Sequence, residues 1–382
     1  MPKPFDVIVL GLGAMGSAAA CHLASRGTRV LGIEQFTSPH DKGSSHGGSR
    51  IIRQAYFESP DYIPLVLRAY ELWRKVEADT GTKLLHTTGG LTLGDATSEL
   101  VSRTVAAARA HSIPFEMFDV AEVRRRFPAL EPLAGDIAVL EPHAGYLPPE
   151  ECIRANLKLA AAAGAELHFE ERVLGWNAAD GHGGGHVSVR TVRGTYEAAH
   201  LVVTAGPWAN EALAGLFPLR VTRQVVAWIA PRGGVAPFLP QRFPVFLIEQ
   251  GSARGYGFPA IDGAAGGMKV AVHGSDEVCT AGTVDREIHP ADLERIRQTL
   301  TVRIPALDGE VLRAQTCLYT MTPDENFILG AHPGSAGCTL ACGFSGHGFK
   351  FAPIVGEVLA DLATTGSTAH PIGLFDPNRF SR

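Results

Sequence analysis

Two arginines, Arg50 and Arg53, are the side chains of this sequence best suited to hold an acidic small molecule. They follow a loop of glycines and small polar residues in HDKGSSHGGSRIIRQAY, residues 40–56. A planar guanidinium can bind both oxygens of a carboxylate at once. If a helix begins at SRIIRQAY, residues three apart share a face, and both arginines can point into one pocket. The alternative, on spacing alone, is a solvated helix face.

Lys269 is a second candidate, because it interrupts an apolar stretch. It stands between Met268 and Val270 in GMKVAVHG, and only seven of the 34 basic residues of the chain are lysines. The stretch has the pattern of a short strand. An ammonium group kept from water needs a partner or a chemical task. An edge-strand lysine whose head reaches solvent explains the pattern equally well.

The cysteines do not predict a metal site. Cys338 and Cys342 form a Cys-x3-Cys pair, but neither a second pair nor a histidine partner is nearby. Scattered thiols are typical of a reducing cytoplasm, where we expect this protein. Cys317 lies in the block TCLYTMTPDENFILG, residues 316–330. By itself, this thiol is best interpreted as a small buried hydrophobic side chain.

A strand, a glycine-rich turn and a helix near the N-terminus predict a dinucleotide site. The apolar run 7–10 predicts a buried strand, and a helix is expected from about 14 to 25. Between and within them, three glycines complete the GxGxxG pattern: Gly11, Gly13 and Gly16. The first permits a tight turn, the second lets a pyrophosphate approach the backbone, and the third lets helix and strand pack closely. The helix N-terminus adds free N–H groups.

An acidic residue follows at the separation expected for a ribose contact. A second strand, 29–33, ends at Glu34, which lies 23 positions after Gly11. With strand, helix, second strand and acid in register, an adenine dinucleotide is favoured over a glycine-rich turn without a ligand. The pattern does not choose between FAD and NAD.

A second glycine loop precedes a helix near the C-terminus. A strand at 338–342 leads through GFSGHGFK into a segment with apolar residues at helical spacing. The loop carries Gly343, Gly346, His347, Gly348 and Lys350. Backbone N–H groups and positive charge could meet an anion there. A purely structural turn between strand and helix is the alternative.

Composition indicates an ordinary globular chain that acts on small molecules. With 382 residues and 45% hydrophobic content, it can bury a core large enough for two domains or one large domain. A net charge of −5 and a pI near 6.3 offer no basic surface for nucleic acid or for an anionic membrane. We therefore expect neither as a partner.

The pattern along the chain predicts an α/β fold of two interleaved domains. Amphipathic spacing predicts helices at 65–78, 99–112 and 149–163, and 198–210 adds a buried strand that ends at a glycine turn. From about 217 to 318 short strands alternate with turn residues. The alternation of strands and helices that is typical of a nucleotide-binding domain is thus interrupted by this β-rich segment and continues after it.

Seven sequence blocks together resemble one family, the monomeric sarcosine oxidases and their relatives. These FAD-dependent amine oxidases include N-methyltryptophan oxidase. The blocks follow the family's order and approximate spacing, and are FDVIVLGLGAMGSAAA, SHGGSRIIRQAY, RQVVAW, GYGFP, GMKVAVH, TCLYTMTPDENFILG and GFSGHGFKF. The resemblance implies a Rossmann-like FAD-binding domain (1–85, 149–216 and 319–382) and a substrate domain on a large mixed β-sheet (86–148 and 217–318).

The resemblance also implies how FAD is held. A cysteine placed like Cys317 bonds through sulfur to the 8α-methyl group of the flavin, and Val173 falls where the family contacts the adenine through its backbone. The cofactor-binding residues that we expect are Gly11, Gly13, Ala14, Met15, Gly16, Glu34, Ser45, His46, Arg50, Val173, Cys317, Gly343, Gly346, His347, Gly348 and Lys350. No metal is expected.

For the reacting groups, the resemblance assigns Arg53 and Lys350 to a substrate carboxylate and Lys269 to the reaction of the flavin with oxygen. Arg50 and His273 match residues beside the flavin. The resemblance places Tyr256, Tyr319, Leu247 and Gly346 around the substrate. Leu247 takes a place often held by methionine, and Gly48 one typically held by aspartate, so substrate size stays open.

The activity implied is oxidative demethylation of sarcosine or related N-methyl amino acids, with O2 as acceptor and amino acid, aldehyde and H2O2 as products. Bulkier or cyclic secondary amines, such as N-methyltryptophan, pipecolate or proline-like substrates, are the nearest alternative. An NAD-linked dehydrogenase and a dinucleotide-binding protein without catalysis are further alternatives. We expect a monomer whose partners are the amine and O2.

Overall fold

The apolar runs near the N-terminus form the centre of an eight-stranded sheet in the computed structural model, which describes residues 5–179 and 186–380. β1 (Phe5–Leu10) pairs in parallel with β2 (Val30–Ile33) and with β12 (Thr195–Val203). β9 (Glu166–His168) and β20 (Cys338–Cys342) extend this parallel core on its two sides. The antiparallel strands are β10 (Val173–Ala179), β11 (His186–Thr191) and β19 (Ile328–Ala331).

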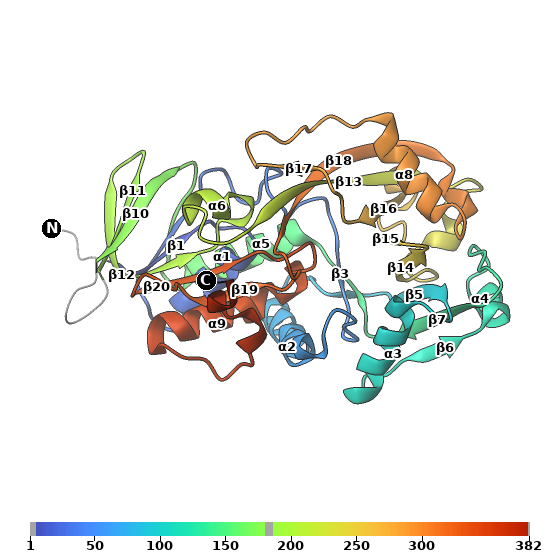
Figure 1. Ribbon diagram of the computed structural model, residues 1–382, viewed down its shortest axis with the longest axis horizontal. Coiled ribbons are helices and arrows are strands. Elements are labelled where there is room, and N and C mark those ends of the chain that lie inside the picture. Colours follow the sequence, from blue (N-terminus) through green and yellow to red (C-terminus); the bar gives the residue numbers. More distant parts are fainter. Residues whose placement is uncertain (1–4, 180–185, 381–382) are drawn as a thin grey trace.

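Four helices share one core with this sheet: α1 (Ala14–Ser25), α2 (Ile63–Thr80), α5 (Pro149–Ala162) and α9 (Ala352–Thr365). In Figure 1, α2 and α9 lie below β19 and β20. The helices expected at 14–25, 65–78, 99–112 and 149–163 all form. Small residues let α1 and α9 approach closely, since a Cβ on Gly356 would lie 2.6 Å from the Ala18 carbonyl carbon. The opposite face packs against β10, β11 and α6 (Ala209–Ala212).

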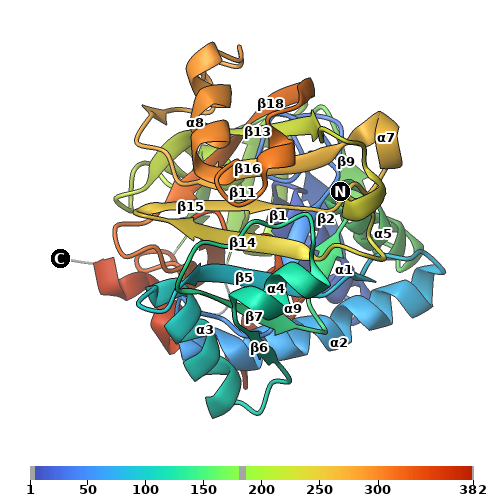
Figure 2. The same ribbon diagram turned by 90° about the vertical axis from the view of Figure 1, so that its right-hand side faces the viewer.

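The second sheet has nine strands, and its central strands cross Figure 2 side by side. All its pairs are antiparallel except β5 with β14. The strands are β5 (Gly90–Asp95), β6 (Glu116–Phe118), β7 (Asp136–Glu141), β13 (Arg220–Ala230), β14 (Val245–Gln250), β15 (Ala253–Gly257), β16 (Met268–His273), β17 (Val278–Cys279) and β18 (Glu310–Met321). The large mixed sheet and the α/β class implied by the resemblance are thereby confirmed.

The register of this sheet places the chemistry on one face. Lys269 pairs with Trp228, Leu247 with Tyr256, and Cys317 with Gln224. Because side chains alternate along a strand, residues two apart share a face. Lys269 and His273 therefore project to one side of β16, which we call the site face. Val270 and Val272 project to the other side, where they pack in a core with α8 (Pro290–Leu300).

A small three-stranded sheet joins the two large ones and corrects one expectation. Arg50–Ile52 is strand β3, not the start of a helix, and it pairs with β8 (Gly145–Leu147), which also pairs with β4 (His86–Thr87). The two isoleucines favour extended backbone, and the pairing with β8 supplies its hydrogen bonds. Arg50 and Arg53 consequently do not share a helix face.

The remaining helices are distributed along the described chain. They are α3 (Glu99–Ala110), α4 (Val120–Arg126), α7 (Gly263–Gly266) and the short 3-10 turns Pro60–Tyr62, Gly206–Trp208, Ala236–Phe238, Pro305–Leu307, Phe349–Phe351, Gly373–Phe375 and Pro377–Phe380. Among residues 5–179 and 186–380, no helix has the length and apolar character needed to span a membrane.

Candidate active site

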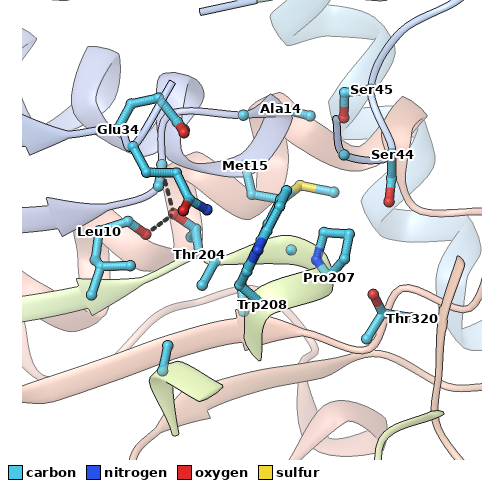
Figure 3. A pocket seen from close by; sticks show the side chains of 18 of the residues that line it. Leu10, Ala14, Met15, Glu34, Ser44, Ser45, Thr204, Pro207, Trp208 and Thr320 are labelled. Carbon is cyan, nitrogen blue, oxygen red and sulfur yellow. Dashed lines mark hydrogen bonds between the residues drawn. The ribbon is translucent and has the colours of Figure 1, made fainter. Parts of the chain in front are cut away.

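A cavity of about 760 Å³ runs between the first sheet and the site face of the second. Its walls come from the GxGxxG loop, residues 34–45, the turn after β12, the end of β18 and the loop 343–348. Figure 3 shows several of these side chains, among them Glu34, Met15, Trp208 and Thr320. Segments far apart in sequence thus enclose one elongated space.

The GxGxxG loop has the geometry that a pyrophosphate requires. A Cβ on Gly13 would meet no atom within 4 Å, so its backbone is open to the cavity. Gly11 has a φ of +89°, and a Cβ there would lie 2.6 Å from the carbonyl oxygen of Thr204. A Cβ on Gly16 would lie 1.7 Å from the carbonyl oxygen of Gly11. The three glycines are therefore needed for the reasons that the motif predicts.

The start of α1 can receive an anion. The first turn of this helix has no acidic side chain, and no side chain caps its N–H groups. Glu34 stands at the end of β2 and lines the same cavity. Its carboxylate accepts the N–H groups of Leu12 (2.9 Å) and Phe36 (3.1 Å), while burial raises its pKa. These residues fit an adenine dinucleotide.

Cys317 is buried next to Arg50, which lines the cavity. The Nη2 atom of Arg50 is 3.6 Å from the sulfur, and the same nitrogen donates to the Ser44 carbonyl (2.8 Å). Burial acts to raise the pKa of the Cys317 thiol, but His46 and the Arg50 guanidinium outweigh it and lower the pKa to about 7. The thiolate is the nucleophilic form of a cysteine.

Lys269 is 3% exposed and is held by backbone oxygens. Its Nζ donates to the carbonyls of Gly47 (2.8 Å) and Ser49 (2.7 Å) and approaches the Ser49 hydroxyl (3.3 Å). Three acceptors match the three donors of an ammonium ion. Burial, and next the charge of Arg50, lower the pKa of Lys269 well below its usual value. The edge-strand alternative is wrong, because β16 lies between β13 and β15.

Arg53 is buried and already holds a carboxylate. Its Nη2 atom lies 2.7 Å from both oxygens of Glu58, and its Nη1 atom donates to the Ala55 carbonyl. Aromatic rings of Tyr56 and Phe57 each lie 4.4 Å from the guanidinium carbon. Burial opposes the charge of Glu58, but Arg53 lowers the pKa of this carboxyl to about 2. The pair shows that Arg53 can bind a carboxylate in this buried place.

Lys350 completes a hydrogen-bonded chain beside Arg53. Its Nζ donates to the His347 carbonyl (2.7 Å) and to the Tyr56 hydroxyl (3.2 Å), which is 2.6 Å from His347 Nδ1. Burial and the charge of Arg53 lower the pKa of Lys350 to about 7. The ring of His347 packs in an aromatic cluster with Tyr62 and Phe327.

Two tyrosines and a histidine meet on the site face of the second sheet. The hydroxyls of Tyr256 and Tyr319 are 3.4 Å apart, and the His273 ring lies 5.4 Å from that of Tyr319. Burial raises the pKa of both tyrosines and lowers that of His273 to about 4, so all three are neutral near pH 7. Gly346 approaches closely, since a Cβ there would lie 2.4 Å from the Tyr319 ring.

The structure divides the expected residues into two groups. Those that line the cavity are Gly11, Gly13, Ala14, Met15, Glu34, Ser45, Arg50, Val173, Tyr319, Gly343, Gly346 and Gly348. Those outside its lining are Gly16, His46, Leu247, Tyr256, Lys269, His273, Cys317, His347, Lys350 and Arg53. In the second group, Cys317 and Lys269 are buried around Arg50, whereas Lys350 is buried near Arg53.

Several residues of the site were not singled out from the sequence. Thr204 donates to the carbonyl of Gly11 (2.8 Å), and Trp208 lines the cavity with it (Figure 3). Glu58 pairs with Arg53, and Tyr56 bonds to Lys350. A carboxylate five residues after a candidate arginine was a signal for Glu58. Nothing in the local sequence signals that Tyr56 is a hydrogen-bond partner of Lys350.

The described ranges, 5–179 and 186–380, contain no group of three His, Cys, Asp or Glu side chains arranged to hold a metal ion. The fold and the cavity together define a dinucleotide-dependent oxidoreductase. A family model described as FAD dependent oxidoreductase matches residues 6–362. The choice between FAD and NAD, which the glycine motif leaves open, is thereby settled for FAD.

Known proteins are similar to this chain over its whole length. Monomeric sarcosine oxidase of Streptomyces avermitilis is 48% identical, and the match covers 100% of this chain and 99% of that protein. N-methyl-L-tryptophan oxidase of Yersinia pestis is 35% identical, with coverage of 98% and 99%. The solved open form of NikD, an unusual amino acid oxidase essential for nikkomycin biosynthesis, matches with a TM-score of 0.82 at 28% identity, covering 98% of this chain and 97% of that one.

This chain belongs to the family of FAD-dependent oxidoreductases that includes monomeric sarcosine oxidase and N-methyl-L-tryptophan oxidase. It is a flavin-dependent enzyme. The resemblance seen in the seven sequence blocks is confirmed.

Proposed function

We propose that this protein oxidises sarcosine or a related N-methyl amino acid with O2. The observation that carries the proposal is the pair of buried basic groups, Arg53 and Lys350. The charges of both act on His273, whose ring lies beside Tyr319 in the wall of the cavity that fits FAD. A carboxylate bound there would place the neighbouring secondary amine close to Tyr256 and Tyr319. The similarity to monomeric sarcosine oxidase at 48% identity supports the same substrate class.

The residues of this chain would orient the substrate and favour the neutral form of its amine. FAD supplies the redox chemistry, by accepting the equivalent of a hydride from the carbon next to the amine. Arg53 would fix the carboxylate, and proximity would then account for much of the rate. Oxidation requires the neutral amine, and the positive charges of Arg50 and Lys350 near the site favour loss of its proton. Water would hydrolyse the imine product to an amino acid and an aldehyde.

A panel of secondary amines tests this function directly. We expect peroxide release with sarcosine and other N-methyl amino acids, and little with the corresponding amines that lack a carboxylate. N-methyltryptophan, pipecolate and proline are included, because they represent the bulkier and cyclic alternative. Peroxide with no amine of the panel would contradict the proposal. Preference for a cyclic or bulky member would favour the alternative, which the similarity to N-methyl-L-tryptophan oxidase supports.

We further propose that Cys317 attaches the flavin covalently. Its pKa of about 7 is the supporting observation, since the equally buried Cys338 has a pKa raised by burial to about 12. We propose too that the enzyme works as a monomer in the cytoplasm, which the free state of all six cysteines and the similarity to monomeric sarcosine oxidase support. Light scattering of the purified protein tests the monomer.

Replacing Cys317 by serine should free the flavin. In the unaltered protein the yellow colour stays with the precipitate after acid denaturation, whereas in the Cys317→Ser variant it passes to the supernatant. Because the thiolate is the reactive form, attachment during reconstitution should speed up as the pH rises through about 7. Cys338→Ser is the matched control and should keep the flavin bound. Release of flavin from the unaltered protein would show that there is no covalent bond.

A further inference from the structure

Both backbone polar groups of Gly47 are hydrogen-bonded to charged side chains. Its N–H group donates to the carboxylate of Glu150 at 2.6 Å, and its carbonyl accepts from Lys269 at 2.8 Å. The next N–H group, that of Gly48, lies 3.2 Å from both oxygens of Glu150. The Gly47 carbonyl and the Gly48 N–H group belong to one peptide unit, so this peptide joins the Glu150 carboxylate to the Lys269 ammonium. Movement of Glu150 would shift an oxygen that holds Lys269.

Glu150 is anchored on a rigid element. It stands in the first turn of α5, and Ile153 and Leu157 of that helix are buried in the core shared with α1. The loop that it holds contains two adjacent glycines, which lack the Cβ that restricts other residues, and Gly47 and Gly48 have φ values of +90° and +77°. We therefore expect the shape of this loop to depend on its outside contacts.

A favourable position at the start of α5 does not explain why Glu150 contacts the Gly47–Gly48 loop, as a comparison with Glu151 shows. Glu151 stands in the same first turn, yet its exposed side chain pairs with Arg154 at the surface. Both carboxylates are suited to the positive end of the helix dipole. Glu150 in addition turns toward the glycine loop, where it accepts two backbone N–H groups.

Positive charges surround Lys269, so a nearby negative group would stabilise its ammonium form. Arg50 is close, and Arg313 stacks 3.8 Å from the Trp228 ring, whose centre lies 5.5 Å from Lys269 Nζ. Both arginines disfavour the ammonium form, whereas Glu150 and the Cys317 thiolate favour it. A thioether sulfur, which is bonded to two carbon atoms, carries no charge. If Cys317 attaches the flavin, the contribution of Glu150 therefore becomes more important.

We propose that Glu150 is a positioning residue for Lys269, which it holds in place through the peptide between Gly47 and Gly48. The inference rests on the proposed function, in which Lys269 promotes the reaction with oxygen. Glu150 touches neither substrate nor cofactor in this scheme. Its removal should therefore affect the oxygen reaction and leave reduction by the amine unchanged.

Two variants at this position separate charge from hydrogen bonding. In the flavin-loaded enzyme, Glu150→Gln keeps an acceptor for the loop, whereas Glu150→Ala removes it. Stopped-flow measurement should show the oxygen reaction slowed about tenfold in Glu150→Ala, the factor expected for losing a hydrogen bond to a charged group, and less in Glu150→Gln. In both variants the rate should fall with rising pH earlier than in the unaltered enzyme, since less negative charge stabilises the ammonium. Glu151→Gln is the matched control and should change neither rate.

A second measurement does not depend on activity. Hydrogen–deuterium exchange of the peptide spanning 44–50 should be faster in Glu150→Ala than in the control, because the Gly47 and Gly48 amides lose their acceptor. Unchanged oxygen rates in both Glu150 variants, or equal slowing of both half-reactions, would overturn the inference provided that Lys269→Met slows the oxygen reaction alone. A Lys269→Met variant without that selective effect would instead contradict the proposed function of Lys269.

Discussion

Lys269→Met slows the reaction of the reduced enzyme with oxygen by about a hundredfold, the size typical of removing one preorganised charged or hydrogen-bonding group. Reduction by the amine is expected to stay within a few-fold of the original rate, because Lys269 is held by the Gly47 and Ser49 carbonyls and not by the groups near Arg53. A cation near the ring stabilises the negative charge that develops as electrons pass to oxygen. Methionine has a similar length and no charge.

The pH dependence adds an independent signature. In the proposed role the active form of Lys269 is protonated, and burial together with Arg50 lowers its pKa well below the usual value. The oxygen rate should therefore decline as the pH rises, in a range below that of an ordinary lysine, and the Met variant should show no such decline. Stopped-flow traces under anaerobic and aerobic conditions separate the two half-reactions. Equal slowing of both would count against this role.

Removing the Arg53 guanidinium should strongly weaken the binding of substrates that carry a carboxylate. Arg53→Met alone would leave the buried Glu58 carboxylate unpaired, so the informative variant is Arg53→Met/Glu58→Gln. We expect kcat/KM for sarcosine to fall about a hundredfold, as for a buried charge pair worth about 3 kcal/mol. Lys350 would still bind the substrate carboxylate, and this remaining contact limits the fall in kcat/KM.

The single variant Glu58→Gln is the matched control for that experiment. It removes the internal carboxylate that occupies Arg53, so affinity for a substrate carboxylate should stay the same or improve. A secondary amine without a carboxylate provides a second comparison, because its slow oxidation should not change in the double variant. If the double variant kept the original apparent affinity for sarcosine, Arg53 would not be the carboxylate clamp.

The division into two domains remains a proposal. The strands of the first sheet come from residues 5–33, 166–203 and 328–342, and those of the second from 90–141 and 220–321. The small sheet joins β3 to strands on the other side of the proposed boundary at residue 85. This pattern favours interleaved domains with a shared border.

The sequence by itself determined the features whose physical cause is local. Helix α1 spans Ala14–Ser25 as expected, because a glycine turn, alanine-rich propensity and the stop at Gly27 all lie within a few residues. The GxGxxG glycines and Glu34 could be assigned for the same reason. The reading of Arg50–Ile52 as helix failed, because its pairing with β8 involves residues almost a hundred positions away.

Only the tertiary structure decided which side chains meet. Strand register sets whether Lys269, Tyr256 and Cys317 share a face, and a slip of one residue would turn each to the other side. The partners of the buried charges, Tyr56 for Lys350 and the Gly47 carbonyl for Lys269, follow from loop shape and sheet packing. These are contacts between distant segments, and no local pattern of side chains encodes them.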